Sequence, residues 1–325
     1  MRPNIAYIWL ALLIILLSPI KPWAQNSMVG DGFGGRAWYK PTNYTVGSYS
    51  AYTICGDSHQ LYGWGANHHR ELGDGTTVHS ATPIKVLGMT NVKYYSTGYN
   101  MGAIKFDSTG WYWGSPVSNV PVKLLDSVKF LDAGAQMCTF VKYDGTVWSV
   151  GRNNNGIFGN DTITINVSTT PQKAKNINNA VRVAVSRMNM AILCSDGSVW
   201  ITGSNSNGGL GNKSNFSTVA KVAVKNPKLK KIVDVKGTST NIIALDSAGY
   251  VYTWGAPTGL GLGINNKQDS VSRIPGLNNI VAISGCDDGF HFLALDINHD
   301  VYAWGNNYGG ALGSGNGGSV NTPII

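Results

Sequence analysis

Charged side chains are scarce in this chain, and acidic ones are the scarcest. Only 13% of the 325 residues are charged, and Asp and Glu number 17 against 25 Lys and Arg. The sequence contains no nucleophile elbow, no HExxH and no carboxylate pair repeated with catalytic spacing. We therefore expect no catalytic residues and no enzyme, although acid and base groups from separate segments could still converge in the fold.

Long apolar runs and helical periodicity are missing outside the N-terminus. Arg2 precedes the apolar run from Ile5 to Leu17, and "SPIKPWAQ" offers a cleavage site after Ala24. We expect residues 1–24 to be a signal peptide, so that the protein is secreted or held at the cell surface. No later run replaces it as a membrane span. An uncleaved anchor is the alternative, because Pro22 is an awkward residue near a cleavage site.

What the chain does contain is a repeat. Its anchors are glycines that each end an apolar segment, and they follow one another after 49, 37, 52, 52 and 50 residues. A period near fifty residues indicates a propeller or another repeat array. The anchor pairs are Trp64-Gly65, Trp113-Gly114, Val150-Gly151, Thr202-Gly203, Trp254-Gly255 and Trp304-Gly305.

The frame around the anchors predicts β-strands. Strand-like segments such as "TVWSVG" and "YVYTWG" end at them, and the pairs Asp144-Gly145 and Asp196-Gly197 predict the tight turns that introduce two of these segments. A second pair, Leu-Gly or Phe-Gly, lies seven and eight residues after the anchor in five of six units. These pairs are Leu72-Gly73, Phe158-Gly159, Leu210-Gly211, Leu262-Gly263 and Leu312-Gly313.

The recurring pattern "WGxNxxGxLGxG…P", carried by "WGANHHRELGDGTTVHSATPIKV" and "WGNNYGGALGSGNGGSVNTPII", resembles the regulator of chromosome condensation repeat. The resemblance runs from about Gly30 to Ile325. It implies an all-β fold, a β-propeller of four-stranded blades that usually number seven. Unit 2 departs from the pattern, because only "SPVSN" separates Gly114 from "VPVKLL", so we expect a short rim there.

The units predict three segments: the signal peptide 1–24, an N-terminal tail strand at 25–47, and six propeller units at 48–325. The stretch Val29–Val46 matches the end of a unit but has no unit start before it. We expect a seven-bladed architecture in which this tail belongs to an incomplete blade whose beginning would lie beyond Ile325. The alternative is a closed six-bladed ring with residues 29–46 as an added outer strand.

Four cysteines fall at unmatched positions of the repeat, which excludes a disulfide repeated within each unit. They are Cys55, Cys138, Cys194 and Cys286. We expect buried free thiols. Cys138 and Cys194, in adjacent units, are the one pair worth testing for a bond.

Several motifs suggest chemistry that their context does not support. "GDGFGG" and "GSGNGG" fit a dinucleotide-binding pattern, but neither opens a helix, so we expect no cofactor. His68 and His69 lack a third ligand, and "CDDGFH" at 286–291 lacks partners, so we expect no metal. Lysines gather in one stretch and could meet an anionic partner or simply protect a strand edge. They are Lys221, Lys225, Lys228, Lys230, Lys231 and Lys236.

These observations favour a secreted or cell-surface binding module that presents loops from several blades to a protein or glycan ligand. A secreted propeller enzyme acting on polysaccharide and an adhesion or spacer domain of a larger surface protein are the alternatives. We expect a monomer that binds no nucleic acid. The resemblance also covers nucleotide-exchange factors for small GTPases, but no exchange-factor residue matches here.

Candidate contact residues stand where framework positions of the post-anchor loops vary. Arginine and tyrosine among them are typical of binding hot spots. The candidates are His68, His69, Arg70, Arg152, Asn154, Asn207, Asn307 and Tyr308.

Overall fold

The computed structural model describes residues 44–325 except 47–49, 135, 286–288 and 316. All of them belong to one of the two units into which the chain divides, Thr42–Ile325. No helix in this part of the chain is long and apolar enough to cross a membrane. The expected signal peptide and most of the expected tail strand lie outside the described residues.

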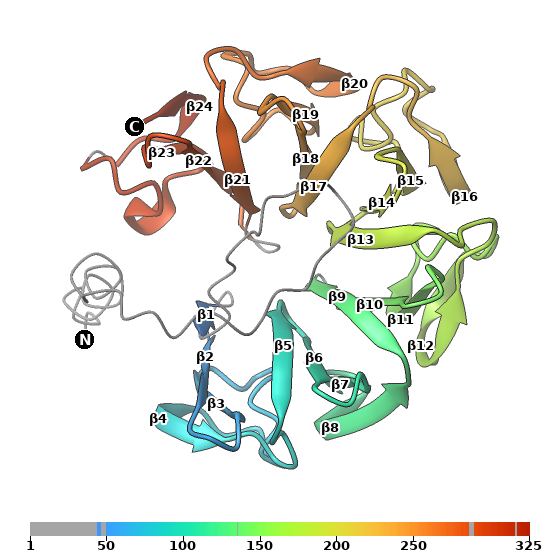
Figure 1. Ribbon diagram of the computed structural model, residues 1–325, viewed down its shortest axis with the longest axis vertical. Helices are drawn as coiled ribbons and strands as arrows, with labels where there is room; N and C mark the ends of the chain where they lie inside the picture. The colour runs from blue at the N-terminus through green and yellow to red at the C-terminus, as the bar shows by residue number, and fades with distance from the viewer. Residues whose placement is uncertain (1–43, 47–49, 135, 286–288, 316) are drawn as a thin grey trace. The chain divides into compact units, whose positions relative to one another are not determined.

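Six four-stranded antiparallel sheets follow one another along the chain, one for each sequence unit, and we call them blades 1 to 6 (Figure 1). Blade 1 contains β1 (Tyr44–Val46), β2 (Ser50–Cys55), β3 (Gln60–Gly65) and β4 (Ser80–Lys85). Blade 2 contains β5 (Val92–Thr97), β6 (Met101–Lys105), β7 (Gly110–Gly114) and β8 (Ser118–Leu125). Blade 3 contains β9 (Val128–Gly134), β10 (Met137–Lys142), β11 (Val147–Asn153) and β12 (Thr164–Lys173). Blade 4 contains β13 (Ala180–Val185), β14 (Asn189–Cys194), β15 (Val199–Ser204) and β16 (Val219–Lys225). Blade 5 contains β17 (Ile232–Gly237), β18 (Asn241–Asp246), β19 (Val251–Gly255) and β20 (Gln268–Arg273). Blade 6 contains β21 (Ile280–Gly285), β22 (His291–Asp296), β23 (Val301–Gly305) and β24 (Val320–Ile324), with a short 3₁₀ turn, η1 (Tyr308–Gly310), before β24. The all-β propeller fold predicted from the repeat is confirmed.

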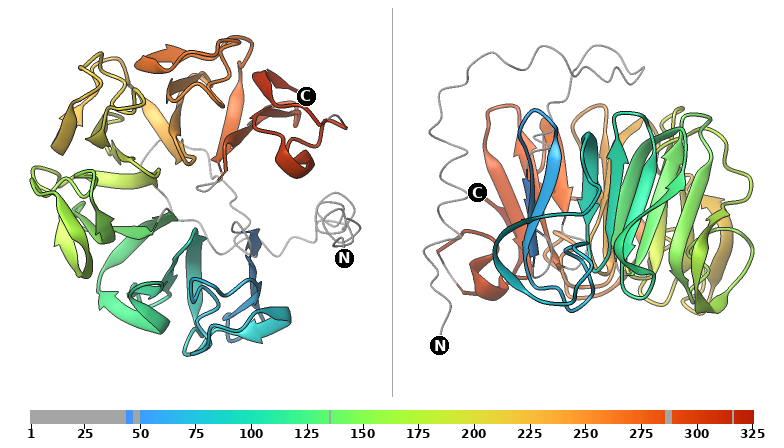
Figure 2. Two further views of the ribbon diagram at one scale, coloured as in Figure 1. Left: turned by 180° about the vertical axis from the view of Figure 1, so that it is seen from behind. Right: turned by 90° about the horizontal axis from the view of Figure 1, so that it is seen from below.

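The first strand of each blade is the one that contacts its counterparts, since β5 meets β9, β9 meets β13, β13 meets β17 and β17 meets β21. The strands run between two ends of the blades, as the side view of Figure 2 shows. One end carries the turns between the first and second strands and the loops between the third and fourth strands. We call this end the loop face.

The core lies between neighbouring sheets. Each of five apolar clusters joins one consecutive pair of blades. In blades 2 to 5 the second strands are packed from both sides and are buried without alternation, and every residue of β14, "NMAILC", is buried. The repeat therefore stabilises itself through interfaces between units, as expected for a stacked array.

A recurring contact explains the Trp-Gly anchors. The indole of Trp254 in blade 5 donates a 2.9 Å hydrogen bond to the Gly209 carbonyl of blade 4, and a Cβ on Gly211 would lie 2.9 Å from that indole. Trp113 and Trp304 bond the preceding blade in the same way. Thus the glycine of the Leu-Gly pair leaves room for the tryptophan of the next blade.

The two departures at the anchor have structural reasons. Thr202 replaces the indole with a hydroxyl that donates a 2.6 Å hydrogen bond to the Ile157 carbonyl. Only residues 115–117 join β7 to β8, so blade 2 has the expected short rim. Blade 2 therefore offers no glycine loop for a tryptophan from blade 3, and the position holds the fully buried Val150.

Two details of the predicted frame are corrected. In blade 5 the pair at the interface is Leu260-Gly261, because Trp304 packs over Gly261, and not Leu262-Gly263. Tyr44–Val46 pairs with β2 as the first strand of blade 1, so these residues are neither the outer strand of a seventh blade nor an added outer strand. Among the described residues no strand pairing joins blade 6 to blade 1, and the seventh blade stays a prediction.

Candidate functional site: the loop face of blades 1 to 4

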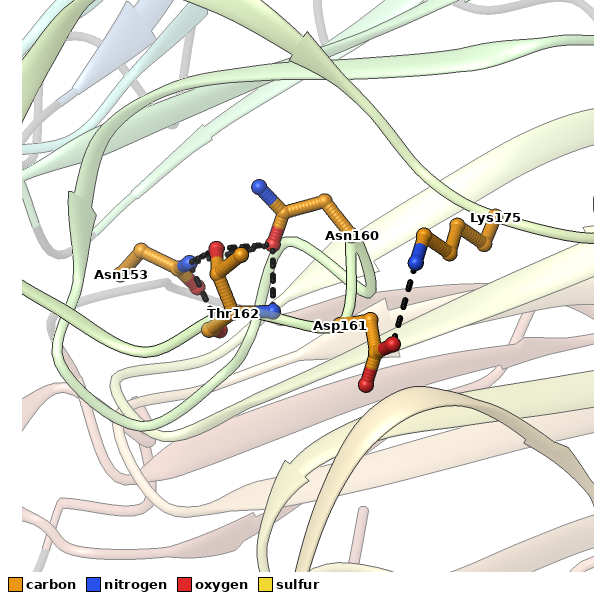
Figure 3. Close-up of polar contacts among 5 residues, drawn as sticks. All are labelled: Asn153, Asn160, Asp161, Thr162 and Lys175. Atoms are coloured by element: carbon orange, nitrogen blue, oxygen red, sulfur yellow. Dashed lines mark hydrogen bonds and ion pairs between the residues drawn. The ribbon is translucent and has the colours of Figure 1, made fainter.

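A buried asparagine holds each long loop in blades 1, 3, 4 and 6. In blade 3, Asn153 Oδ1 accepts a 3.0 Å hydrogen bond from the Phe158 backbone N–H. Its Nδ2 donates to Asn160 Oδ1 and to the Thr162 carbonyl, and Figure 3 shows these three residues. Lys175 closes the far side of this loop through a 3.0 Å ion pair with Asp161. The loops are therefore positioned from inside, which leaves their outward side chains free to vary.

Asn307 is the member of this set in blade 6, which corrects its place among the candidate contacts. It is 2% exposed, and its Oδ1 accepts a 2.9 Å hydrogen bond from the Leu312 backbone N–H, as Asn67 and Asn205 do at equivalent positions. Its amide is committed to its own loop. The sequence pattern contained this signal, since asparagine recurs at the position.

Arg70 does replace a framework glycine. Its φ is +61°, in the left-handed region, where Gly156, Gly208 and Gly310 stand in the other long loops. A Cβ on Gly208 would collide with the outer strand of blade 5, whereas blade 2, next to Arg70, has the short rim. The side chain is tolerated in blade 1 because its neighbour leaves space.

The anchor glycines fasten the loops to the turns beside them. Gly255 has φ +121°, and a Cβ there would lie 2.7 Å from the Thr240 carbonyl of the neighbouring turn. The same close approach brings Gly151 to Gln136 and Gly203 to Met188. A side chain at these positions would force the turn and the loop apart.

Turns and loops from four blades enclose one concavity of about 400 Å³ on the loop face. This volume lies in the usual range for ligand pockets. Blade 1 contributes a loop residue, blades 2 and 4 contribute turns between first and second strands, and blade 3 contributes both. The lining residues are His69, Tyr99, Gln136, Met137, Arg152, Asn154, Asn155, Arg187 and Met188.

The concavity is basic. Arg152 and Arg187 are both exposed, and neither forms an ion pair within the described part of the chain. No aspartate or glutamate is among the described residues that line it. The imidazole of His69 packs edge-on against Tyr99 at 5.0 Å between ring centroids, and its backbone N–H donates a 2.6 Å hydrogen bond to Glu71. The cationic groups thus face solvent without acidic neighbours in the lining.

The structure brings half of the predicted contact residues together. His69, Arg152 and Asn154 line the concavity, and the Asn207 amide reaches Met188 on its border at 4.0 Å from the sulfur. His68 is exposed and packs against His79, and Tyr308 is 92% exposed on η1. None of the four remaining candidates lines the concavity: His68, Tyr308, Arg70 and Asn307.

Sequence reasoning missed the other six lining residues. Tyr99, Gln136, Arg187 and Met188 occupy the turns between first and second strands, Met137 begins β10, and Asn155 lies in the loop of blade 3. The signal that could have found the turn residues is position, because each turn lies next to an anchor glycine in the fold.

A second concavity, of about 470 Å³, lies at the other end of the blades. It is lined by six consecutive residues, Lys173 to Asn178, which join β12 to β13. A single connection forms it, so it does not gather side chains from several blades.

The structure describes part of the other motifs: the possible metal ligands, the cysteines and the lysine stretch. No group of three His, Cys, Asp or Glu that could hold a metal occurs among the described residues, and 286–288 of the "CDDGFH" loop lie outside them. Burial lowers the pKa of His291, which favours its neutral form. Cys138 and Cys194 are buried and free, whereas Cys55 is exposed, contrary to the expectation of burial. Lys221 and Lys225 lie exposed on the outer strand β16, as strand-edge lysines do.

Known proteins share the repeat and the fold. Residues 58–104 match the family described as "Regulator of chromosome condensation (RCC1) repeat". The Ultraviolet-B receptor UVR8 of Arabidopsis thaliana is 25% identical over 272 residues, which cover 75% of this chain and 60% of that protein. The chain thus spans less than two thirds of the length of this relative.

Among solved structures, human WBSCR16 superimposes with a TM-score of 0.76 at 18% identity, covering 87% of this chain and 80% of that one. Yeast RCC1 (Prp20), solved bound to Kap60, gives a TM-score of 0.72 at 16% identity, covering 87% of this chain and 74% of that one. These likenesses concern the fold, and the repeat match concerns the sequence. Together they show that this chain carries an RCC1 repeat and has the fold of RCC1-like β-propellers.

Proposed function

We propose that this protein is an exported binding module that holds a protein ligand on the loop face of blades 1 to 4. The observation that carries the proposal is the concavity to which four successive blades contribute side chains. Its lining combines arginine, tyrosine and methionine with amides, a mixture typical of protein-binding surfaces. A propeller of the same fold, yeast RCC1, was solved bound to a protein, Kap60.

The rigidity of the site supports the same proposal. Arg152 N–H donates to the Gln136 carbonyl, and Arg187 N–H donates to the Ser239 carbonyl of blade 5. Backbone hydrogen bonds of this kind fix where the side chains start before any ligand arrives. A preorganised surface loses less conformational entropy on binding.

The alternatives have weaker support. A polysaccharide-cleaving enzyme would need an acid and a base near the substrate, and the described lining includes no carboxylate. A glycan ligand would favour aromatic faces, and Tyr99 is the one aromatic residue in that lining besides His69. An adhesion or spacer role within a longer protein remains compatible with the same binding face.

Site-specific photo-crosslinking tests the proposal. A photoreactive amino acid replaces Asn154 in the concavity, and a matched variant carries it at Asn178 in the second concavity, where the side chain is also exposed. We expect a discrete protein adduct from Asn154, competed by unmodified protein, and none from Asn178. Equal crosslinking from the two positions, or competition by oligosaccharide alone, would refute a protein ligand on the loop face.

Export is tested separately, by N-terminal sequencing of the mature protein. We expect the mature chain to begin at Gln25, after cleavage following Ala24. A mature chain that retains Arg2 and stays inside the cell would exclude export through this segment.

A further inference from the structure

We propose that the concavity on the loop face receives an acidic peptide segment, whose carboxylates are held by Arg152 and Arg187. This inference rests on the proposed function, and it adds the chemistry of the ligand. The two arginines come from different blades, Arg152 from the end of β11 in blade 3 and Arg187 from the turn between β13 and β14 in blade 4. Both line the same concavity.

Neither arginine has an acidic partner among the described residues, in contrast to three paired cations of the chain. Arg182 lies 4.0 Å from Asp234, Lys175 lies 3.0 Å from Asp161, and Lys123 lies 2.7 Å from Asp126. Arg152 and Arg187 form no such pair within the described residues, in a chain that is poor in acids throughout. A carboxylate from a ligand would supply the bidentate partner that a guanidinium fits best.

Backbone hydrogen bonds fix the main chain from which the two arginine side chains project. The turn that carries Arg187 is closed by Ser186, whose hydroxyl lies 3.0 Å from the Asn189 backbone N–H and 3.1 Å from its carbonyl. Asn189 in turn donates from Nδ2 to the Ser204 carbonyl at 2.7 Å. Because the main chain is held on both sides, only the long side chains need to order when a ligand binds.

The rest of the lining suits a peptide better than a small anion. Gln136, Asn154 and Asn155 offer amide donors and acceptors that match peptide groups, and the partly exposed Met188 offers apolar surface. A volume of about 400 Å³ accommodates several side chains. An isolated ion would leave most of this surface uncovered.

A peptide-binding series tests the inference on the whole protein. The probe is a fluorescent decapeptide of alternating Glu and Gly, compared with its Gln-Gly counterpart and with an oligogalacturonate as an anionic glycan. We expect the Glu-Gly peptide to bind at least about 10-fold more tightly than the other two. Tighter binding of the oligogalacturonate would overturn the choice of a peptide.

Two double variants distinguish binding in the concavity from non-specific attraction to the net charge of +8. Arg152→Gln/Arg187→Gln removes two charges from the concavity, and Lys85→Gln/Lys230→Gln removes two exposed charges outside its lining. We expect the first pair to weaken binding of the Glu-Gly peptide at least about 10-fold and the second less than about 2-fold. Equal losses would show non-specific attraction and overturn the inference. Unchanged thermal melting checks that each variant is folded.

The outcome also distinguishes this inference from the function on which it rests. If the protein adduct at Asn154 survives in the Arg152→Gln/Arg187→Gln variant at full yield, the loop face binds a protein and the acidic-segment inference fails. If the peptide binds as expected but no protein adduct forms at Asn154, the carboxylate site stands and the proposed function fails.

Discussion

The same sequence frame occurs at the interface between blades 4 and 5 and on the outer side of blade 6. The glycine of its Leu-Gly pair is buried at the interface and exposed on blade 6. At the interface, the Trp254 indole is fully buried over Gly211. On blade 6, the equivalent Gly313 has a similar φ of +67°, yet a Cβ there would meet nothing within 4 Å. Val251 of blade 5 is 0% exposed against blade 6, whereas its equivalent Val301 is 49% exposed.

Blade 1 carries the complementary half of this contact. Trp64 is only half-buried, whereas Trp113, Trp254 and Trp304 are fully buried. Blade 6 thus carries a glycine without its tryptophan, and blade 1 carries a partly exposed tryptophan, so each lacks a blade neighbour within the described residues. The difference teaches that a tryptophan packed over a glycine of the preceding blade is one of the contacts that join neighbouring blades.

Removing the tryptophans should have the largest effect. We expect Trp254→Ala to lower the free energy of unfolding by about 3–5 kcal/mol, because it leaves a cavity and an unpaired Gly209 carbonyl. Trp64→Ala should cost less than about 2 kcal/mol, because its side chain is only half-buried. Urea denaturation measures both, and losses of the same size would break the comparison.

The two equivalent glycines allow a more closely matched comparison of the blade interface with the outer side of blade 6. Gly211→Ala and Gly313→Ala both place a side chain in the left-handed region, at φ +60° and +67°, which costs about 1 kcal/mol in each. Gly211→Ala should cost about 1–3 kcal/mol more, since its Cβ would lie 2.9 Å from the Trp254 indole. Thermal unfolding of the two variants side by side measures this difference. An equal shift would mean that the indole does not require glycine beneath it.

The loop asparagines should behave alike at both places. Asn153→Ala and Asn307→Ala each remove a buried amide whose hydrogen bonds among the described residues lie within its own blade, so each should cost about 1–3 kcal/mol. Equal losses would show that the loops are locally held even on the side where blade contacts are missing. A much smaller loss for Asn307→Ala would indicate that the blade 6 loop depends on a neighbour.

The smallest effect concerns the turns between second and third strands. The Ser198 hydroxyl and backbone N–H donate to Asp196 and lower the pKa of its carboxyl below the usual 3.8. A lowered folded pKa stabilises the fold above the unfolded pKa, and this contribution is lost as pH falls through the folded value. NMR titration should show the pKa of Asp196 rise in Ser198→Ala. An unchanged midpoint would remove the hydroxyl as the cause.

The sequence predicted what depends on short, repeated chemistry. Trp-Gly anchors, Asp-Gly turns and the shortened blade 2 are local patterns, and each appears where expected. Arg70 was read correctly as a replaced glycine, but Asn307 was misread as a contact, because its burial depends on a loop that folds over it. Tyr99 and Arg187 were missed because they lie in turns outside the loops that follow the anchors, and these turns meet those loops only when the blades assemble.

Hydrogen–deuterium exchange with and without the crosslinked ligand tests the central claim most directly. Binding on the loop face should protect the backbone amides of the turns at residues 98–100 and 186–188 and leave the connection at 174–179 unchanged. Protection confined to residues 174–179, or spread evenly over both ends of the blades, would contradict a binding site on the loop face.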